Sequence, residues 1–293
     1  MSTAAWPAPA KLNLFLHVTG RRADGYHDLQ TLFQFLDYGD RLWFEPEAAG
    51  VIRRLAGNEA VPAADDLVLR AAQALAQAAG CRQGVAIRID KRLPAGGGLG
   101  GGSSDAATTL VALNHLWGLG MSAQDLADIG LGLGADVPVF VHGRAAWAEG
   151  VGERLTPVEG LDEPCYLVVQ PALSVSTAEI FSDPGLTRDT PRITIADFLS
   201  GEGRNDLEPV VVRRHPGVGA ALAWLSRHAP ARVTGSGACV FAPFADAAKA
   251  RAALQALPPP WTGFVARGCN RSPLLARLEQ AAGQQVSWGV AKR

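Results

Sequence analysis

The chain has 293 residues, of which 48% are hydrophobic and 19% are charged, and its formal net charge is -1. A chain of this length can bury roughly 75% of its unfolded surface and usually divides into two domains. The near-neutral charge argues against nucleic acid as a partner, because a phosphate backbone requires clustered Lys and Arg side chains.

Several other classes of protein are disfavoured by simple patterns. Residues 1–7 lack the charged start and apolar core of a signal peptide, and no apolar run is long enough to cross a bilayer. The four cysteines form no C-x-x-C pair, and the six histidines show no metal-ligand spacing. We therefore expect a cytoplasmic protein with no membrane contact, no disulfide and no metal site of its own.

The first part of the chain predicts strands and one helix. Residues 12–18 and 42–46 have strand character, with the turn-prone segment 20–25 between them. Residues 64–79 begin with carboxylates and continue with apolar residues at helical spacing, and residues 85–90 predict another strand.

A glycine-rich loop follows this strand and is the most informative stretch of the sequence. Residues 94–105 read PAGGGLGGGSSD, and a helix is expected at once over residues 106–116. Glycine lets backbone N–H groups approach a ligand, and a helix N-terminus adds unpaired donors and partial positive charge. A strand, a glycine loop and a helix in this order predict a phosphate site rather than a flexible linker. The residues expected to hold nucleotide phosphates are Pro94, Ala95, Gly96, Gly97, Gly98, Leu99, Gly100, Gly101, Gly102, Ser103 and Ser104.

Three common nucleotide loops fit this stretch poorly. Gly96, Gly98 and Gly101 satisfy a dinucleotide pattern, but that pattern belongs in the first βα unit, and a long strand-like and polar segment precedes them. Ser103 stands where a Walker A loop has its lysine. The H-R-D and D-F-G strings of protein kinases do not occur in the chain.

The remainder of the chain mixes helices and strands. A helix over residues 122–130, capped by Ser122 with Asp125 three positions on, is followed by an expected strand pair at 139–150. Beyond residue 153 the expected strands are 166–170, 263–267 and one after the glycine turn 234–237, and the expected helices begin at residues 177, 205, 219 and 245. This mixture lacks regular βαβ repetition and predicts an α+β fold.

The predicted division is into domains of residues 1–155 and 156–293. We expect residues 280–293 to be a mobile tail, because chain termini are poorly ordered unless they dock on the rest of a domain.

Three segments resemble the motifs of one known family. The loop at residues 94–106 resembles the phosphate loop of the GHMP small-molecule kinases. Residues 9–18 (PAKLNLFLHV) are similar to the first motif of that family, and residues 234–242 (TGSGACVFA) to its third. On these motifs the chain is identified as a GHMP kinase. The resemblance implies a two-domain α+β fold with the active site in the cleft between the domains.

Further strings narrow the resemblance to one branch of the family. Residues 20–29 (GRRADGYHDL), 32–40 (LFQFLDYGD) and 133–140 (LGADVPVF) are similar to the branch that phosphorylates a cytidine-diphosphate-linked methylerythritol. The resemblance implies transfer of phosphate from ATP to the 2-hydroxyl of that small molecule. Mg²⁺ is expected with the ATP, and the protein is expected to be a monomer or a weak homodimer.

Two charged residues are expected to carry the chemistry. Asp136 lies in a glycine-flanked loop and, from the residues alone, is equally well an N-cap or turn residue or a functional acid. The resemblance implies that it accepts the proton of the substrate hydroxyl. Lys11 is the lone lysine of the apolar segment 9–18, and buried lysines are rare unless paired. Beside Asp136 it would keep the carboxylate ionised and offset charge on the transferred phosphoryl group.

Five residues are expected to bind the acceptor substrate. Asn13 lies two positions after Lys11, on the same side of a strand, although a surface-facing asparagine is the alternative. The resemblance implies that Tyr26 stacks on cytosine and that His27 hydrogen-bonds to the edge of the base, whereas unaided the pair reads as a loop tip. Phe181, with Thr177 four residues earlier, is expected to close the other side of this pocket.

Two further features have a weaker interpretation. Gly235, Ser236 and Gly237 either support the phosphate loop from the second domain or form a tight core turn. Asp105 adds a negative charge close to the expected phosphates, and the sequence assigns it no role.

Overall fold

Two long strands run through both halves of the molecule. The computed structural model describes residues 4–283, and it begins with the antiparallel pair β1 (Trp6–Arg21) and β2 (His27–Glu47). One end of this pair, with Trp6 and Phe33, is buried in one hydrophobic core, and the other end, with Leu16, belongs to a second core. Each strand thus contributes to both halves of the molecule.

The first half is a sheet covered by helices on one face. The other strands here are β3 (Ile52–Ala56), β4 (Gly84–Asp90), β5 (Ala146–Gly150) and β6 (Arg154–Pro157). The helices are α1 (Leu67–Ala78), α2 (Gly101–Leu116), α3 (Ala123–Leu131), α4 (Val137–His142) and α10 (Pro273–Ala282). β2 pairs with β1, β4 and β5, and only the pairing of β3 with β4 is parallel among the described strands.

The second half is a smaller antiparallel sheet with its own helices. Its strands are β7 (Cys165–Gln170), β8 (Arg232–Val233), β9 (Val240–Phe244) and β10 (Thr262–Cys269). Its helices are α5 (Thr177–Ser182), α6 (Ile195–Leu199), α7 (Glu208–Arg214), α8 (Pro216–Ser226) and α9 (Ala247–Gln255). β10 pairs with β7 along its length and with β2 at its end, so the two sheets are continuous.

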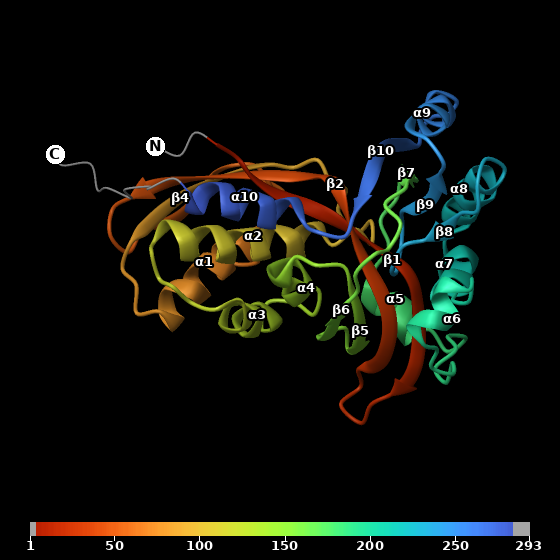
Figure 1. Ribbon diagram of the computed structural model, residues 1–293, viewed down its shortest axis with the longest axis horizontal. Helices are drawn as coiled ribbons and strands as arrows, with labels where there is room; N and C mark the ends of the chain where they lie inside the picture. Colours follow the sequence, from red (N-terminus) through yellow and green to blue (C-terminus); the bar gives the residue numbers. More distant parts are fainter. Residues whose placement is uncertain (1–3, 284–293) are drawn as a thin grey trace.

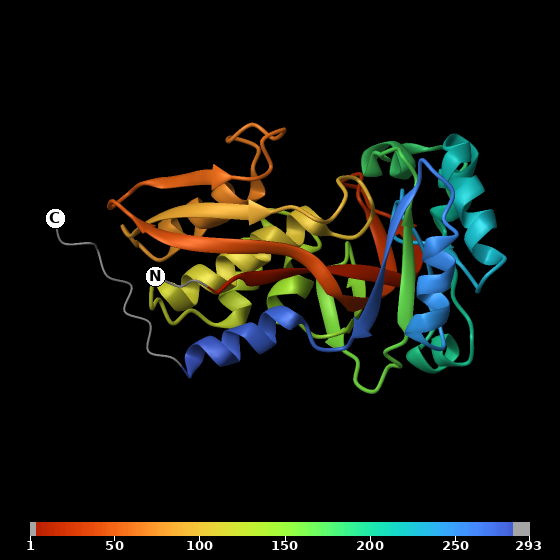
Figure 2. The ribbon, with the colours of Figure 1, turned by 90° about the horizontal axis from the view of Figure 1, so that it is seen from above.

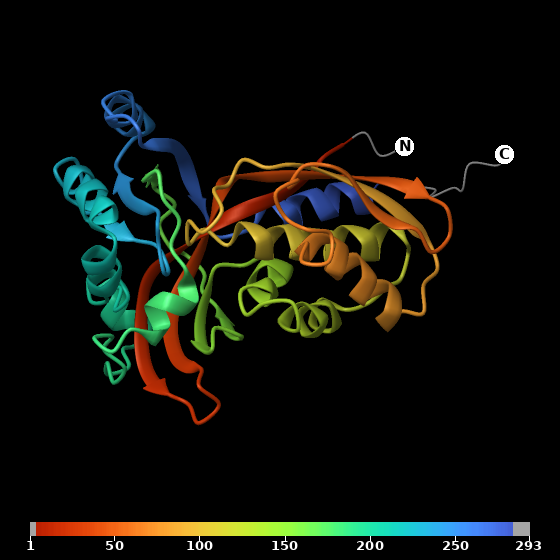
Figure 3. The same cartoon turned by 180° about the vertical axis from the view of Figure 1, so that it is seen from behind.

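The figures show how these halves lie together. Helices α1 to α4 and α10 gather at one end of the molecule, and α5 to α9 gather at the other, with β1 and β2 between them (Figure 1). Seen from above, the two groups lie side by side along the long axis (Figure 2). From behind, the turn that joins β1 to β2 projects beyond α5 and α6 (Figure 3).

The mixture of antiparallel sheet and helices is the α+β fold expected from the sequence. The helix expected at residues 122–130 is α3, Ala123–Leu131, and Ser122 and Asp125 make a reciprocal capping box at its start. The expected strand pair at 139–150 was wrong in its first half, where α4 occupies Val137–His142. The strands expected at 12–18 and 42–46 are parts of the much longer β1 and β2.

The end of the described chain also differs from expectation. Residues 280–282 belong to α10 and are not part of a mobile tail, because Leu274 and Ala281 on this helix are buried in the first core. Gly283 is the C-cap of this helix, and residues 284–293 of the expected tail lie outside the described residues. The last helix therefore packs on the first half of the molecule, although the proposed division at residues 155/156 assigns it to the second.

Candidate active site

The backbone of the glycine loop has a conformation that leaves no room for side chains at two positions. Gly98 has a φ of +74°, and a Cβ at this position would lie 2.1 Å from the carbonyl oxygen of Thr234. Gly100 has a φ of +73°, and a Cβ there would lie 2.8 Å from the ring of Phe140. Gly100 is the N-cap of α2 and supplies no side-chain cap, so the first N–H groups of this helix are open to an anion.

The loop is held by backbone hydrogen bonds from both halves of the molecule. The amides of Ala238 and Cys239 donate to the carbonyls of Gly96 and Gly97 at 2.9 and 3.1 Å. From the other side, the amide of Lys11 donates to the carbonyl of Leu99 at 3.0 Å. The segment that follows the glycine turn 234–237 thus contacts the loop directly, as expected if this turn supports it.

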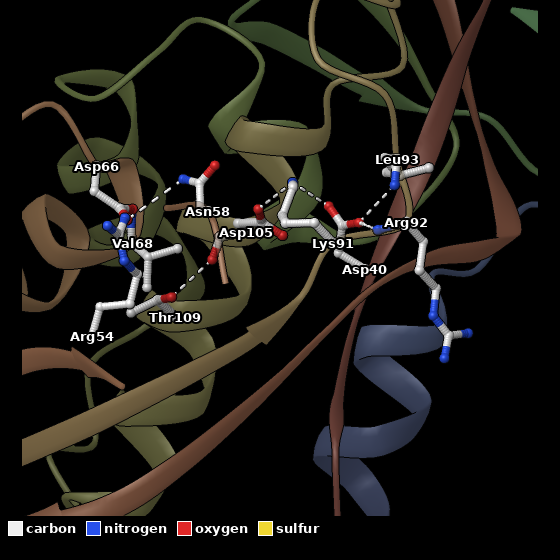
Figure 4. A network of polar contacts seen from close by, with 10 residues as sticks. All are labelled: Asp40, Arg54, Asn58, Asp66, Val68, Lys91, Arg92, Leu93, Asp105 and Thr109. Carbon is white, nitrogen blue, oxygen red and sulfur yellow. Dashed lines mark hydrogen bonds and ion pairs between the residues drawn. The ribbon is translucent and has the colours of Figure 1, made fainter. Parts of the chain in front are cut away.

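A buried ionic group secures the start of the loop (Figure 4). Asp40, on β2, is fully buried, and its Oδ1 accepts hydrogen bonds from the amides of Arg92 and Leu93 at 2.5 and 2.8 Å. The Nζ of Lys91 donates to Asp40 and, at 2.7 Å, to Oδ2 of Asp105 on α2. Asp40 thereby ties the segment leading into the loop to the central strand pair.

This group has one cation for two buried carboxyls. Burial raises the pKa of Asp105 to about 8, against the opposing charge of Lys91. Burial lowers the pKa of Lys91, but the charges of Asp105 and Asp40 outweigh it and the pKa is raised. Burial therefore favours the protonated form of Asp105, which weakens the negative charge near the phosphates that its sequence position suggests.

A second polar group lies farther along the same side of the cavity. Asp66 caps α1 through the amide of Val68 at 2.9 Å and forms an ion pair with Arg54 (Figure 4). Asn58 donates to the same carboxylate at 3.5 Å. These contacts fix the segment leading to α1, which lines one end of the cavity described below.

The two expected catalytic residues are in contact. The Nζ of Lys11 lies 3.2 Å from Oδ2 of Asp136 and donates to Oδ1 of Asn13 at 2.6 Å. Lys11 is 4% exposed and Asp136 is 33% exposed, so the lysine is enclosed and the carboxylate opens to the cavity. Asp136 precedes α4 but makes no side-chain capping bond, which weakens the interpretation of it as a helix cap.

Asn13 faces this pair and is itself fixed. Its Nδ2 donates to the hydroxyl of Thr31 at 3.0 Å, which leaves its oxygen directed at Lys11. Its amide donates to Thr234 Oγ1 at 3.1 Å, on the second half of the molecule. Asn13 therefore faces the site and is not a surface residue.

A single cavity of about 590 Å³ joins these parts. It is lined by residues of both halves of the molecule, so it lies between them. Of the predicted site residues it includes Lys11, Asn13, Asp136, Thr177, Phe181 and all of residues 94–103. Ser104, Tyr26 and His27 do not line it, and Ser104 is fully buried.

The expected cytosine pocket is formed only in part. Phe181 lines the cavity and stacks on His27, with ring centroids 5.2 Å apart. A hydrogen bond of 2.7 Å joins the hydroxyls of Thr177 and Ser236. Tyr26 is 63% exposed in the turn between β1 and β2 and does not line the cavity, and its role with cytosine stays a prediction.

Sequence reasoning missed three residues that hold this site: Asp40, Thr234 and Arg188. Arg188 donates to Nε2 of His27 at 3.0 Å. The signal for Asp40 was present, since it lies in the segment 32–40 that carried the family resemblance.

Among residues 4–283, no group of three or more His, Cys, Asp and Glu side chains could hold a metal ion, and no helix is long and apolar enough to span a membrane.

Comparison with known proteins defines the class. The descriptions "GHMP kinases N terminal domain" and "GHMP kinases C terminal" match residues 66–144 and 187–260. The chain belongs to the GHMP kinase family, and the family predicted from its motifs is confirmed.

The relatives carry a particular name. Proteins called 4-diphosphocytidyl-2-C-methyl-D-erythritol kinase from Halorhodospira halophila and Nitrosococcus oceani are 59% and 60% identical to this chain. The matches cover 95% and 94% of this chain and 98% of each relative. A crystal structure of 4-(cytidine 5'-diphospho)-2C-methyl-D-erythritol kinase is 34% identical, with a TM-score of 0.79 over 90% of this chain and 99% of that one. The mevalonate kinase of Methanococcus jannaschii, at 16% identity and a TM-score of 0.66 over 92% of this chain and 99% of that one, shares the fold.

Proposed function

We propose that this protein transfers the γ-phosphate of ATP to the 2-hydroxyl of 4-diphosphocytidyl-2-C-methyl-D-erythritol, giving the 2-phosphate and ADP. This step belongs to the non-mevalonate route to isoprenoid precursors. The observation that carries the proposal is the cavity that joins a phosphate-binding loop to the Lys11–Asp136 pair. The names of relatives at 59–60% identity support this acceptor. Cytoplasmic location and a monomer or weak homodimer stay predictions.

The glycine loop supplies the donor site. Its open N–H groups and the N-terminus of α2 favour the ATP phosphates, and Ser103 lines the cavity beside them. The cavity continues past Lys91 to Asn58 and Val61, where there is room for the nucleoside of ATP. Mg²⁺ bound to the phosphates would neutralise part of their charge, and Mg²⁺ usually binds through substrate phosphates with few protein ligands.

The catalytic pair faces the acceptor. Phosphoryl transfer needs the attacking hydroxyl aligned and its proton accepted, and a carboxylate within hydrogen-bond reach serves both needs. Asp136 is the only carboxylate that lines the cavity next to Lys11 among the described residues. Lys11 forms an ion pair with Asp136 and places positive charge where negative charge builds up on the transferred group. Asn13, with its oxygen on Lys11, fixes the ammonium group and lies in reach of the polyol.

Two measurements test this function. Phosphorus NMR of the product should show a new phosphomonoester on the 2-hydroxyl when ATP and the cytidylated acceptor are supplied. Methylerythritol phosphate, which lacks the cytidine, should be a poor acceptor, because stacking on a base contributes on the order of 1–3 kcal/mol. Equal kcat/KM for the two acceptors would refute the proposed substrate.

A further inference from the structure

Arg188 lies between α5 and α6 and binds both His27 and the segment around Phe181, whose side chain lines the cavity. Its Nε donates to Nε2 of His27 at 3.0 Å. Its Nη2 donates to the carbonyls of Phe181 and Asp183 at 3.0 and 2.7 Å, and its Nη1 to the carbonyl of Leu186 at 3.0 Å. One guanidinium group thus joins the start of β2 to the end of α5.

The contact determines which nitrogen of His27 carries the proton. A guanidinium group only donates hydrogen bonds, so Nε2 of His27 must be an unprotonated acceptor. Burial, together with the charges of Arg188 and Arg21, lowers the pKa of His27, and the ring is neutral at pH 7. The remaining proton is therefore on Nδ1. Within residues 4–283, Nδ1 of His27 makes no hydrogen bond and is not buried. Its N–H group is therefore free to donate to a ligand.

The same arginine also sets the position of the aromatic wall. Phe181 stacks on His27 with an interplanar angle of 29° and lines the cavity. Because Arg188 binds the carbonyl of Phe181 and the ring of His27 at once, it joins the backbone of Phe181 to the imidazole on which the phenyl ring stacks.

We propose that Arg188 is a positioning residue that sets the base specificity of the acceptor site, by holding His27 as an Nδ1–H donor beside Phe181. The proposal rests on the proposed function, in which the acceptor carries cytidine. Cytosine presents an unprotonated ring nitrogen at N3, whereas uracil has an N–H group there. A fixed donor therefore favours cytosine, and a histidine free to exchange its proton between nitrogens would accept either base.

A merely structural role for Arg188 can be separated from this one. The turn after α5 is also held by Arg213 and Arg214, whose side chains bind the carboxylate of Asp183 at 2.5 and 2.7 Å. Neither of these arginines contacts His27 in the described structure. Arg213→Met is thus a matched control that loosens the same turn and leaves the histidine contact intact.

The kinetic test compares Arg188→Met, Arg188→Lys and Arg213→Met in the full chain. With Arg188→Met we expect the acceptor KM to rise about tenfold, and the cytidine-over-uridine preference in kcat/KM to fall at least about tenfold. The kcat and the KM for ATP should stay within about twofold, because the catalytic pair and the glycine loop do not contact Arg188. Arg188→Lys, which keeps one donor, should recover part of the preference, and Arg213→Met should match the original protein.

The spectroscopic test shows directly which ring nitrogen of His27 carries the proton. Long-range ¹H–¹⁵N spectra of the imidazole rings, assigned with a His27→Gln variant, should show His27 in the neutral Nδ1–H form and a shift toward Nε2–H in Arg188→Met. An unchanged tautomer in Arg188→Met would overturn the proposal, as would an unchanged base preference or an equal loss in Arg213→Met. If the original protein fails to phosphorylate the cytidine acceptor, the proposed function fails, and an Nε2–H signal for His27 would separately overturn this inference.

Discussion

Replacing Asp136 by asparagine removes the proposed base with little change in shape. The carboxylate is 33% exposed and makes no capping bond to α4, so the helix loses no hydrogen bond in the variant. Lys11 keeps its bond to Asn13 Oδ1 at 2.6 Å. We therefore expect the fold to persist, with a loss of about 1–3 kcal/mol in the free energy of unfolding, because the enclosed ammonium group loses its counter-charge and keeps only Asn13.

The size of the kinetic effect follows from the geometry of the pair. A positioned general base contributes about 10²–10⁴-fold to a rate. The Lys11 ammonium lies 3.2 Å from Asp136, so the carboxylate is already held beside the charge that acts on the transferred group. We therefore expect a fall in kcat of about 10²–10⁴-fold, or roughly 3–5 kcal/mol in activation free energy.

The assay is steady-state ADP release at saturating ATP and acceptor, with thermal unfolding measured in parallel. The control is Asp128→Asn, which changes an exposed carboxylate on α3 that binds only Gln124 among the described residues. The control should keep kcat within about twofold. A kcat for Asp136→Asn within tenfold of the original protein, with an intact fold, would refute its role as base.

Three further changes test other parts of the account. Lys11→Met should lower kcat by about 10²-fold or more in the same assay, with circular dichroism unchanged, and a near-normal kcat would show that its charge does not act on the transferred group. Asp40→Ala leaves the amides of Arg92 and Leu93 without their acceptor and removes one of the two carboxyl partners of Lys91, so urea unfolding should show a loss of about 2–4 kcal/mol, and an unchanged midpoint would contradict its hold on the loop. The pKa of Asp105 is raised in the fold, so the stability it contributes is full below its unfolded pKa and is lost as pH rises toward about 8. The unfolding temperature should therefore fall more between pH 5 and 8 in the original protein than in Asp105→Asn, and parallel curves would contradict the raised pKa.

Local features of the fold could be predicted because few residues carry them. The glycine loop was recognisable since positions such as Gly98 admit no side chain, and Ser122 with Asp125 is a complete helix start within four residues. The apolar run Val139–Phe140–Val141 misled, because a short buried run fits a strand or a buried helix equally well. Pro138, which suits the first turn of a helix, was the signal that favoured α4.

The site was predictable where its residues belong to recognised motifs. Lys11 and Asp136 were expected to pair, and they do, although their chemical roles stay predictions. The contacts that hold the site were not predictable, because they join distant parts of the chain. Arg188 meets His27 across 161 positions and Lys91 meets Asp40 across 51, and neither pair has a local pattern.

The central claim is that this glycine loop serves a kinase whose acceptor carries cytidine. The most direct measurement is ADP release with four acceptors: 4-diphosphocytidyl-2-C-methyl-D-erythritol, galactose, homoserine and mevalonate. We predict a kcat/KM for the cytidylated acceptor at least about 100-fold above that of the other three, because only it carries a base that can contact the Phe181–His27 stack. ADP formed only with an acceptor that lacks cytidine would contradict the account.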